Sequence, residues 1–345
     1  MKILISGAAG AIGRRLVSIL LAEGHQITAV AHSMIGRAQL MHLGATAIDL
    51  DLFDPSAVRS SLAGHDALIN LATHAPRSAT AVFRPCAGRD TDRVQRDASA
   101  VLASGCLQAG VPRFIQESCA AVYPDCGDRW IDESVHIRPL RDDRRVGEAE
   151  AAVHRFSRAG ATGVVLRFGC FYGSDAFQTT DAIRWLRKAR VPISGSPDAY
   201  ISSIAHDDAA QAAAAALALP AGIYNAVDDE PVTTREYFES LSRALGVVSP
   251  HFQPAWLASL SGAPGVMPDR SLRISNRKLR AACDWKPTNG SVREAWPGLL
   301  ARLRALESVD SLWLPPGGSP SPCLTKPFNS SSASSSPTKT SAAGS

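Results

Sequence analysis

The sequence predicts an α/β protein built on a doubly wound parallel sheet, and three observations lead to this expectation. Short apolar runs alternate with helical patterns through the first half of the chain, as in a parallel sheet with helices on both faces. A glycine-rich turn, residues 7–13, joins the first apolar run to the first helical pattern. The second half mixes strands and helices less regularly. Together these features indicate a Rossmann-type sheet with a smaller mixed α/β C-terminal substrate lobe.

The strands predicted in the first half are short apolar runs, which is typical of strands buried on both faces. They cover residues 2–6, 26–31, 45–48, 67–72 and 113–117. The helices between them carry apolar residues three or four positions apart, and several close at a glycine. They cover residues 11–23, 38–43, 55–64 and about 92–109. Each helix therefore connects two strands, as the crossovers of a parallel sheet do.

The same patterns continue in the second half, with strands at 163–167 and 222–226 and helices at 144–157, 207–219 and 234–245. We expect one nucleotide-binding domain over residues 1–310, whose substrate lobe is formed mainly by 170–205 and 228–300. Residues 315–345 are rich in Ser and Pro and have little to bury, so this tail is predicted to be disordered.

The bulk composition is that of an ordinary globular protein, with 45% hydrophobic residues, 20% charged residues and a net charge of +4. No block of Lys and Arg indicates a nucleic-acid partner, and no apolar run is long enough to span a membrane. The N-terminus lacks the pattern of a signal peptide. None of the seven cysteines forms a CxxC pair, so neither a disulfide framework nor a metal site is predicted. We expect a cytoplasmic protein.

The glycine turn is the strongest chemical motif of the sequence. Gly7, Gly10 and Gly13 lie between a predicted strand and a predicted helix, where glycines let the backbone approach a pyrophosphate closely. The start of the helix adds unpaired N–H groups and a partial positive charge. The alternative is a strand-to-helix turn that uses small residues only for packing.

With its GxxGxxG spacing, the chain resembles the extended or atypical branch of the short-chain dehydrogenase/reductase superfamily, which includes the NAD-dependent epimerase/dehydratase family. The resemblance continues almost to residue 300. The similar segments are Asp51–Asp54, Asn70–Thr73, Ser118–Tyr123, Val165–Phe168, Phe171–Gly173, Ile204–Asp208, Gly222–Asn225 and Lys278–Pro287. It implies a bound dinucleotide, a small-molecule substrate and pairing of cofactor-domain helices into a homodimer.

The resemblance and the glycine turn together give a set of expected cofactor-binding residues. Asp51 is expected to bind the adenine amino group, while Leu71, Ala72 and Thr73 are expected to line the ribose and nicotinamide side. The full set is Gly7, Ala9, Gly10, Ala11, Ile12, Gly13, His32, Arg37, Asp51, Leu52, Leu71, Ala72, Thr73 and Phe168.

The end of the second strand bears on the choice between NAD(H) and NADP(H). An acid there usually binds the ribose hydroxyls of NAD. The strand ends at Ala31, His32 and Ser33, with no acid, and Arg37 follows. This pattern favours the 2′-phosphate of NADP(H), unless His32 and Arg37 are simply solvated loop residues.

The catalytic pair that the resemblance implies is missing. In this superfamily a tyrosine exchanges the proton, and a lysine four residues later lowers its pKa. The sequence contains no Tyr-x-x-x-Lys, and no lysine occurs between Lys2 and Lys188. By count, the pair falls in RDDRRVGEAE, residues 141–150, with Asp142 near the tyrosine position and Val146 near the lysine position.

As structure, RDDRRVGEAE needs no catalytic role. Apolar residues at helical spacing predict a helix with one buried face formed by Val146, Ala149, Val153 and Phe156. Asp142 or Asp143 would cap its start. Asp142 remains a candidate acid/base if burial raises its pKa.

Ser118, Cys119 and Tyr123 are the other catalytic candidates, because a hydroxyl or thiol near nicotinamide could orient a substrate oxygen. The simpler interpretation of Cys119 and Tyr123 is packing, and His206 with the two aspartates after it most simply caps a helix. The candidates for the substrate pocket are Tyr172, Gln178 and Tyr200.

Three functions agree with these features. The first is an NAD(P)-dependent oxidoreductase or epimerase/dehydratase-like enzyme acting on a small, specialised metabolite with a non-standard proton donor. The second is a non-redox enzyme, a cyclase or isomerase, on the same scaffold. The third is a dinucleotide-binding regulatory protein without catalysis, since fold alone does not fix function.

Overall fold

The computed structural model describes residues 1–72, 94–138, 144–188, 193–253 and 270–312. The chain divides into two compact units, residues 1–302 and 303–345. The central sheet and the candidate site belong to the first unit. The predicted tail, residues 315–345, lies outside the described ranges.

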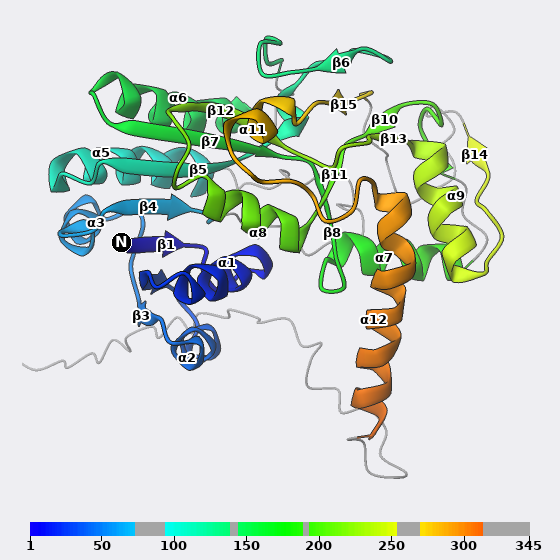
Figure 1. Cartoon of the computed structure of the whole chain (residues 1–345), viewed down its shortest axis with the longest axis horizontal. Coiled ribbons are helices and arrows are strands. Elements are labelled where there is room, and N and C mark those ends of the chain that lie inside the picture. The colour runs from blue at the N-terminus through cyan, green and yellow to red at the C-terminus, as the bar shows by residue number, and fades with distance from the viewer. Residues whose placement is uncertain (73–93, 139–143, 189–192, 254–269, 313–345) are drawn as a thin grey trace, which may run out of the picture. The chain divides into compact units, whose positions relative to one another are not determined.

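Seven strands form the central sheet, and every pair of neighbours is parallel. Their order is β12-β7-β5-β4-β1-β2-β3, so the chain winds outward from β1 in both directions (Figure 1). The strands are β1 (Lys2–Ser6), β2 (Gln26–Val30), β3 (Thr46–Ile48), β4 (Ala67–Asn70), β5 (Arg113–Cys119), β7 (Thr162–Phe168) and β12 (Gly222–Ala226). The doubly wound parallel sheet expected from the sequence is confirmed.

Helices cover both faces of the sheet, and two separate apolar clusters result. The helices are α1 (Ala11–Ala22), α2 (Met34–Leu43), α3 (Pro55–Leu62), α5 (Ser99–Ala109), α6 (Arg144–Arg158) and α8 (His206–Ala215). Within β1, Ile3 and Ile5 pack into the cluster with α1 and α8, whereas Leu4 packs into the cluster with α3, α5 and α6. Burial on both faces explains the continuous apolar strands.

The smaller lobe is built from short strand pairs and aromatic packing. It contains β8 (Cys170–Tyr172), α7 (Phe177–Arg187), β9 (Ile193–Ser194), β10 (Tyr200–Ile201), β11 (Ser203–Ala205), β13 (Val232–Thr233), α9 (Thr234–Leu245), β14 (Phe252–Gln253), β15 (Arg273–Ile274), α11 (Arg277–Ala282) and α12 (Val292–Leu312). β8 pairs with β11, β10 with β13, β9 with β14, and β15 with β6 (Trp130–Ile131). Tyr172 and Tyr237 lie 5.8 and 5.3 Å from the Trp296 ring.

Most predicted elements occur, with shifted ends. Helix α2 begins four residues earlier than predicted, because the Ser33 hydroxyl accepts the Gly36 N–H at 3.0 Å and caps it. The predicted helix 92–109 is described from Val94, and it begins as the π-helical turn Val94–Ala98 before α5. None of the helices in the described ranges is long and apolar enough to cross a membrane.

Candidate functional site

The glycine turn between β1 and α1 is closely packed at two of its three glycines. Gly7 has a φ of +74°, and a Cβ there would lie 2.3 Å from the Leu71 carbonyl oxygen. A Cβ at Gly13 would lie 2.3 Å from the Gly7 carbonyl oxygen. A Cβ at Gly10 would meet one atom of the described residues within 4 Å, the Gly7 carbonyl oxygen at 3.2 Å. Gly7 and Gly13 thus serve the turn and its packing, while Gly10 leaves its backbone open.

Helix α1 begins at this turn without a cap. Gly10 is the N-cap residue, no side chain accepts a hydrogen bond from the first turn, and no acidic residue lies in it. The first amide groups of a helix have no partner inside the helix, so they are available to an anion. An open backbone at Gly10 beside uncapped N–H groups fits the pyrophosphate of a dinucleotide.

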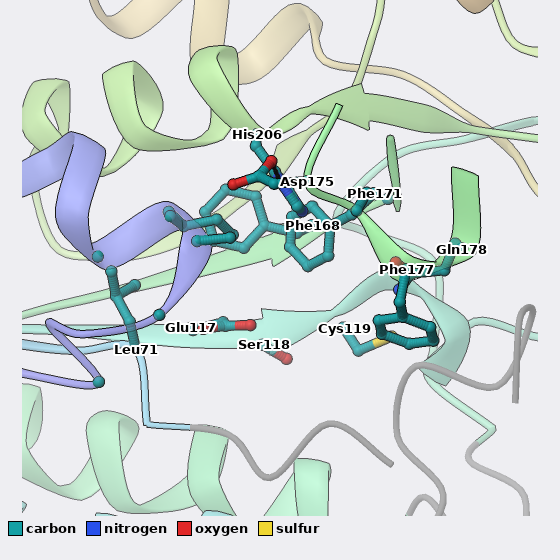
Figure 2. Close-up of a pocket in the computed structure, with 17 residues that line it drawn as sticks. Leu71, Glu117, Ser118, Cys119, Phe168, Phe171, Asp175, Phe177, Gln178 and His206 are labelled. Atoms are coloured by element: carbon teal, nitrogen blue, oxygen red, sulfur yellow. Dashed lines mark hydrogen bonds and ion pairs between the residues drawn. The ribbon is translucent and has the colours of Figure 1, made fainter. Parts of the chain in front are cut away.

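A cavity of about 290 Å³ extends from this turn across the carboxyl ends of β4, β5 and β7 (Figure 2). Three phenylalanine rings form much of its apolar wall. Among the described residues, it is lined by Gly7, Gly10, Ala11, Ile12, Gly13, Leu71, Glu117, Ser118, Cys119, Phe168, Gly169, Phe171, Asp175, Ala176, Phe177, Gln178 and His206. In parallel α/β sheets, ligands bind outside the carboxyl ends of the strands, so the position is that of a cofactor and substrate site.

Ser118 and Cys119, at the end of β5, make hydrogen bonds to different partners. The Ser118 hydroxyl donates to Glu150 Oε1 at 2.6 Å, so it is held toward helix α6. Cys119 Sγ accepts the Ala121 N–H at 3.4 Å, at the start of a short 3₁₀ turn, and also lines the cavity. Of the two candidates, only Cys119 has a polar atom that makes no hydrogen bond to another side chain of the described residues.

Glu150 forms a buried ion pair with Arg167 of β7. The Arg167 guanidinium donates from Nε to Oε1 at 2.8 Å and from Nη2 to Oε2 at 2.6 Å. The side chains are 7% and 3% exposed. The Arg167 guanidinium also lies 4.7 Å from the centre of the Tyr123 ring. RDDRRVGEAE therefore contributes a buried anchor, Glu150, which the sequence interpretation missed.

The predicted buried face of helix α6 is confirmed. Val146, Ala149 and Val153 are each 2% exposed, and Phe156 is fully buried. Val146, near the position expected for the lysine, packs with Cys119 and Val122. Asp142, near the position expected for the tyrosine, lies outside the described residues, as do Asp143 and Thr73.

Glu117 is an acidic residue on the cavity wall that the sequence interpretation did not single out. Its side chain points into the cavity between Leu71 and Ser118 in Figure 2. No described residue makes a hydrogen bond or ion pair with its carboxyl group. Burial without such a partner raises the pKa of Glu117 to about 8. The available sequence signal was an acid in a buried strand, two residues before Cys119 and therefore on the same face.

Asp175 and His206 form a second polar group on the wall. His206 Nδ1 lies 2.9 Å from Asp175 Oδ1, and Arg15 of helix α1 donates to both Asp175 oxygens at 2.8 and 3.1 Å. The hydrogen bond from His206, with that from Arg15, holds the pKa of Asp175 well below its usual range. The predicted capping role of His206 is wrong: Ala205 is the N-cap of α8, and no side chain caps this helix.

The three tyrosines named from the sequence lie outside the cavity wall. Tyr123 is fully buried, its hydroxyl donates to Asn225 Oδ1 at 2.8 Å, and burial raises its pKa to about 12. This arrangement supports packing. Tyr172 lines a separate, smaller cavity beside His206. The Tyr200 ring stacks against the Arg273 guanidinium at 4.8 Å. Gln178, by contrast, lines the main cavity, and its buried Oε1 has no described partner.

The residues expected at the adenosine end also lie apart from this cavity. His32 Nδ1 is 3.1 Å from Asp49 Oδ1, and the Asp51 carboxylate accepts the Phe53 N–H at 2.9 Å. Leu52 is buried in the core. The Ala9 carbonyl oxygen accepts a hydrogen bond from the Arg14 side chain, and the Ala72 N–H donates to Asn70 Oδ1. Among the described residues, no group of three or more His, Cys, Asp and Glu could hold a metal ion.

A family model named "NAD dependent epimerase/dehydratase family" matches residues 3–226. The chain belongs to this family. Within the NAD dependent epimerase/dehydratase family, it is similar to a 3-diazoavenalumate denitrifying reductase from a Streptomyces species. The two are 29% identical over 317 residues, which cover 85% of this chain and 98% of the relative. An epimerase family protein of Mycobacterium leprae is 24% identical over 81% of this chain and 88% of its own length.

Solved structures of two nucleotide-sugar epimerases share the fold. A UDP-glucose 4-epimerase of Thermus thermophilus, in complex with NAD, has a TM-score of 0.69 at 24% identity, over 88% of this chain and 99% of its own. A UDP-glucuronic acid 4-epimerase of Bacillus cereus has a TM-score of 0.70 at 18% identity, over 89% and 99%. The match to the family model over residues 3–226 confirms the family expected from the motifs.

Proposed function

We propose that the protein is an NAD(P)H-dependent reductase of a small, largely apolar substrate. One observation carries the proposal: a single cavity joins the open backbone at Gly10 to the carboxyl end of β5. A dinucleotide whose pyrophosphate lies at the glycine turn can reach the substrate there. When bound, the dinucleotide supplies a hydride at its nicotinamide ring.

The chain's own residues would do the rest. The backbone of the glycine turn and the uncapped start of α1 bind the pyrophosphate. Phe168, Phe171 and Phe177 form an apolar wall that excludes water and suits a flat, apolar substrate. The Gln178 amide, whose buried Oε1 is unpartnered, is available to orient a polar substrate group.

Reduction is favoured over epimerisation by the missing pair. An epimerase that works through oxidation must first remove a proton from a substrate hydroxyl, which requires a strong, positioned base. The sequence has no Tyr-x-x-x-Lys to provide one. A reductase needs only to deliver a proton.

A finer candidate substrate is a diazo compound. It is favoured by the match to a denitrifying reductase over nearly the whole length of that relative. A neutral diazo compound that accepts one hydride and one proton releases dinitrogen and leaves two C–H bonds at the former diazo carbon. A carbonyl compound would take up the same hydride and proton to become an alcohol. Both reactions consume one proton for each hydride.

NADP(H) is the proposed form of the cofactor, because no acid lies at the end of β2 and Arg37 follows on the first turn of α2. His32 would contribute less, because the Asp49 carboxylate lies 3.1 Å from His32 Nδ1 and would compete with a 2′-phosphate for the His32 ring. Replacing Arg37 with Ala should therefore weaken NADPH binding by about tenfold, the usual scale of one charged contact, and leave NADH binding unchanged. Equal affinity for both dinucleotides in the unaltered protein would contradict the preference.

The function is tested by titrating the protein with NADPH and NADH, followed by oxidation assays with a carbonyl panel and with neutral aliphatic diazo compounds. Dinitrogen release is followed by mass spectrometry. We expect the protein to bind the dinucleotide and to oxidise it in the presence of one of the two substrate classes, carbonyl or diazo compounds. Gly10→Asp places a carboxylate at the pyrophosphate position and should abolish binding with the fold intact, whereas Gly147→Ala, whose Cβ meets only Ile137 at 3.6 Å, is the matched control. Binding without turnover would favour a regulatory protein, and no binding would refute the proposal.

A further inference from the structure

We propose that Glu117 is the proton donor of this reduction, a catalytic carboxylic acid in place of the missing tyrosine. The proposal rests on the proposed function, since it assigns the proton that the reduction consumes. Glu117 belongs to β5 and lies on the wall of the main cavity.

The position of Glu117 is the first argument. In the sheet order β7-β5-β4-β1, β5 is two strands from the glycine turn, on the side away from β2 and β3. A dinucleotide bound across these strand ends places its adenosine half over β2 and its other half over β4 and β5. Glu117 and Cys119 are two residues apart, so their side chains lie on the same face of β5, and both line the cavity. Glu117 is thus at the end of the cavity where hydride transfer is expected.

The charges around Glu117 are the second argument. The other titratable side chains on the described cavity wall are Cys119, Asp175 and His206. Asp175 and His206 are paired with each other, and Arg15 is bound to Asp175. Among the described residues of the cavity wall, no unpaired cation is therefore left to stabilise an ionised Glu117.

Arg167 of β7, the buried cation on the strand next to β5, is already ion-paired. Arg167 gives two hydrogen bonds to Glu150, which also accepts the hydroxyl of Ser118. A carboxyl group in this setting is protonated at neutral pH, because desolvation disfavours its charged form. A carboxylic acid that keeps its proton at neutral pH can act as a general acid.

The proton transfer balances the reduction. As the hydride reaches the substrate, Glu117 gives its proton to the atom that receives the new electron pair, the carbonyl oxygen or the diazo carbon. Glu117 is left as a carboxylate and regains its proton from solvent. The net reaction consumes one hydride and one proton for each substrate molecule, and nothing else is required.

The test measures protons rather than turnover. Oxidised nicotinamide carries a positive charge that reduced nicotinamide lacks, so it favours the ionised form of a nearby carboxyl group. Calorimetric titrations at pH 7, in two buffers with different ionisation enthalpies, give the protons released on binding NADP⁺ and NADPH. We expect the oxidised form to release about one proton more than the reduced form.

Glu117→Gln, which has the shape of the protonated acid, should bind both forms and lose this difference. Glu117→Asp keeps a carboxyl group and should retain a difference, while Glu148→Gln, an exposed acid of α6, is the matched control and should behave as the unaltered protein. If both forms bind and release equal numbers of protons, or if Glu117→Gln keeps the difference, Glu117 is not the donor. If neither NADP(H) nor NAD(H) binds, the proposed function itself fails.

Discussion

Replacing Glu117 with Gln should change how the stability of the protein depends on pH. Glu117 has no described charge partner, and burial raises its pKa from 4.5 to about 8. Between these values the unfolded chain has released this proton while the folded protein still holds it. The folded state therefore binds more protons, and the free energy of unfolding falls as pH rises. The Gln side chain does not titrate, so the variant lacks this loss.

The size of the effect follows from the pKa difference. One proton held only by the folded state changes the free energy of unfolding by about 1.4 kcal/mol per pH unit. From pH 5.5 to 7.5, both inside the window, the variant should gain about 2.7 kcal/mol relative to the unaltered protein. Above about pH 9 the two profiles should run parallel, because Glu117 is then ionised in both states.

The measurement is urea unfolding without cofactor at half-unit steps from pH 5 to 9, with Glu148→Gln as control. The Glu148 carboxylate is 54% exposed, so its removal should shift the profile without tilting it. Parallel profiles for Glu117→Gln from pH 5.5 to 7.5 would refute the reasoning. A difference of opposite sign would mean that the Glu117 carboxylate is paired with a cation in the folded state.

Three further outcomes follow from the described contacts. Glu150→Leu should cost about 3–5 kcal/mol in urea unfolding by leaving the Arg167 cation buried and unpaired, and adding Arg167→Met should recover most of it; no recovery would mean that lost packing dominates. Asp175→Asn should reduce the loss of stability on acidification below about pH 4. The pKa of Asp175 is lower in the folded than in the unfolded protein, so its carboxylate stabilises the fold above the unfolded pKa, and this stabilisation is lost as pH falls. An unchanged dependence of stability on pH in the acid range would rule this out. The kcat/KM for reduction should fall above about pH 8. In Glu117→Gln, kcat/KM should be about 10²–10⁴-fold lower and should no longer fall above that pH. If the fall persists in the variant, it is caused by the ionisation of another group.

Much of the fold was predictable because its signals are local. An apolar strand such as β1 or β12 is a contiguous run, and the glycine turn is seven residues long, so one window of sequence contains each. The short strands of the smaller lobe, for example β10 and β13, have two residues each. Two residues show no periodicity, so such strands are visible only once their partners are known.

The polar contacts of the site were not predictable, because they join distant parts of the chain. Asp175 and His206 are 31 residues apart, and Arg15 reaches Asp175 from a separation of 160 residues. The sequence pattern placed His206 at a helix start, which is correct, but could not show that its ring turns to Asp175 rather than to the helix. Glu117 lies within a predicted strand, yet only the cavity shows what its side chain faces.

The burial of Val146 limits what a single substitution can introduce on helix α6. It is 2% exposed and packs against Cys119 and Val122, at the place where relatives are expected to carry the lysine. A lysine restored there by one substitution would bury a charge among apolar neighbours, which is strongly unfavourable. A tolerated lysine at position 146 would therefore need further changes around it, beginning with Cys119 of β5 and Val122 of the turn that follows.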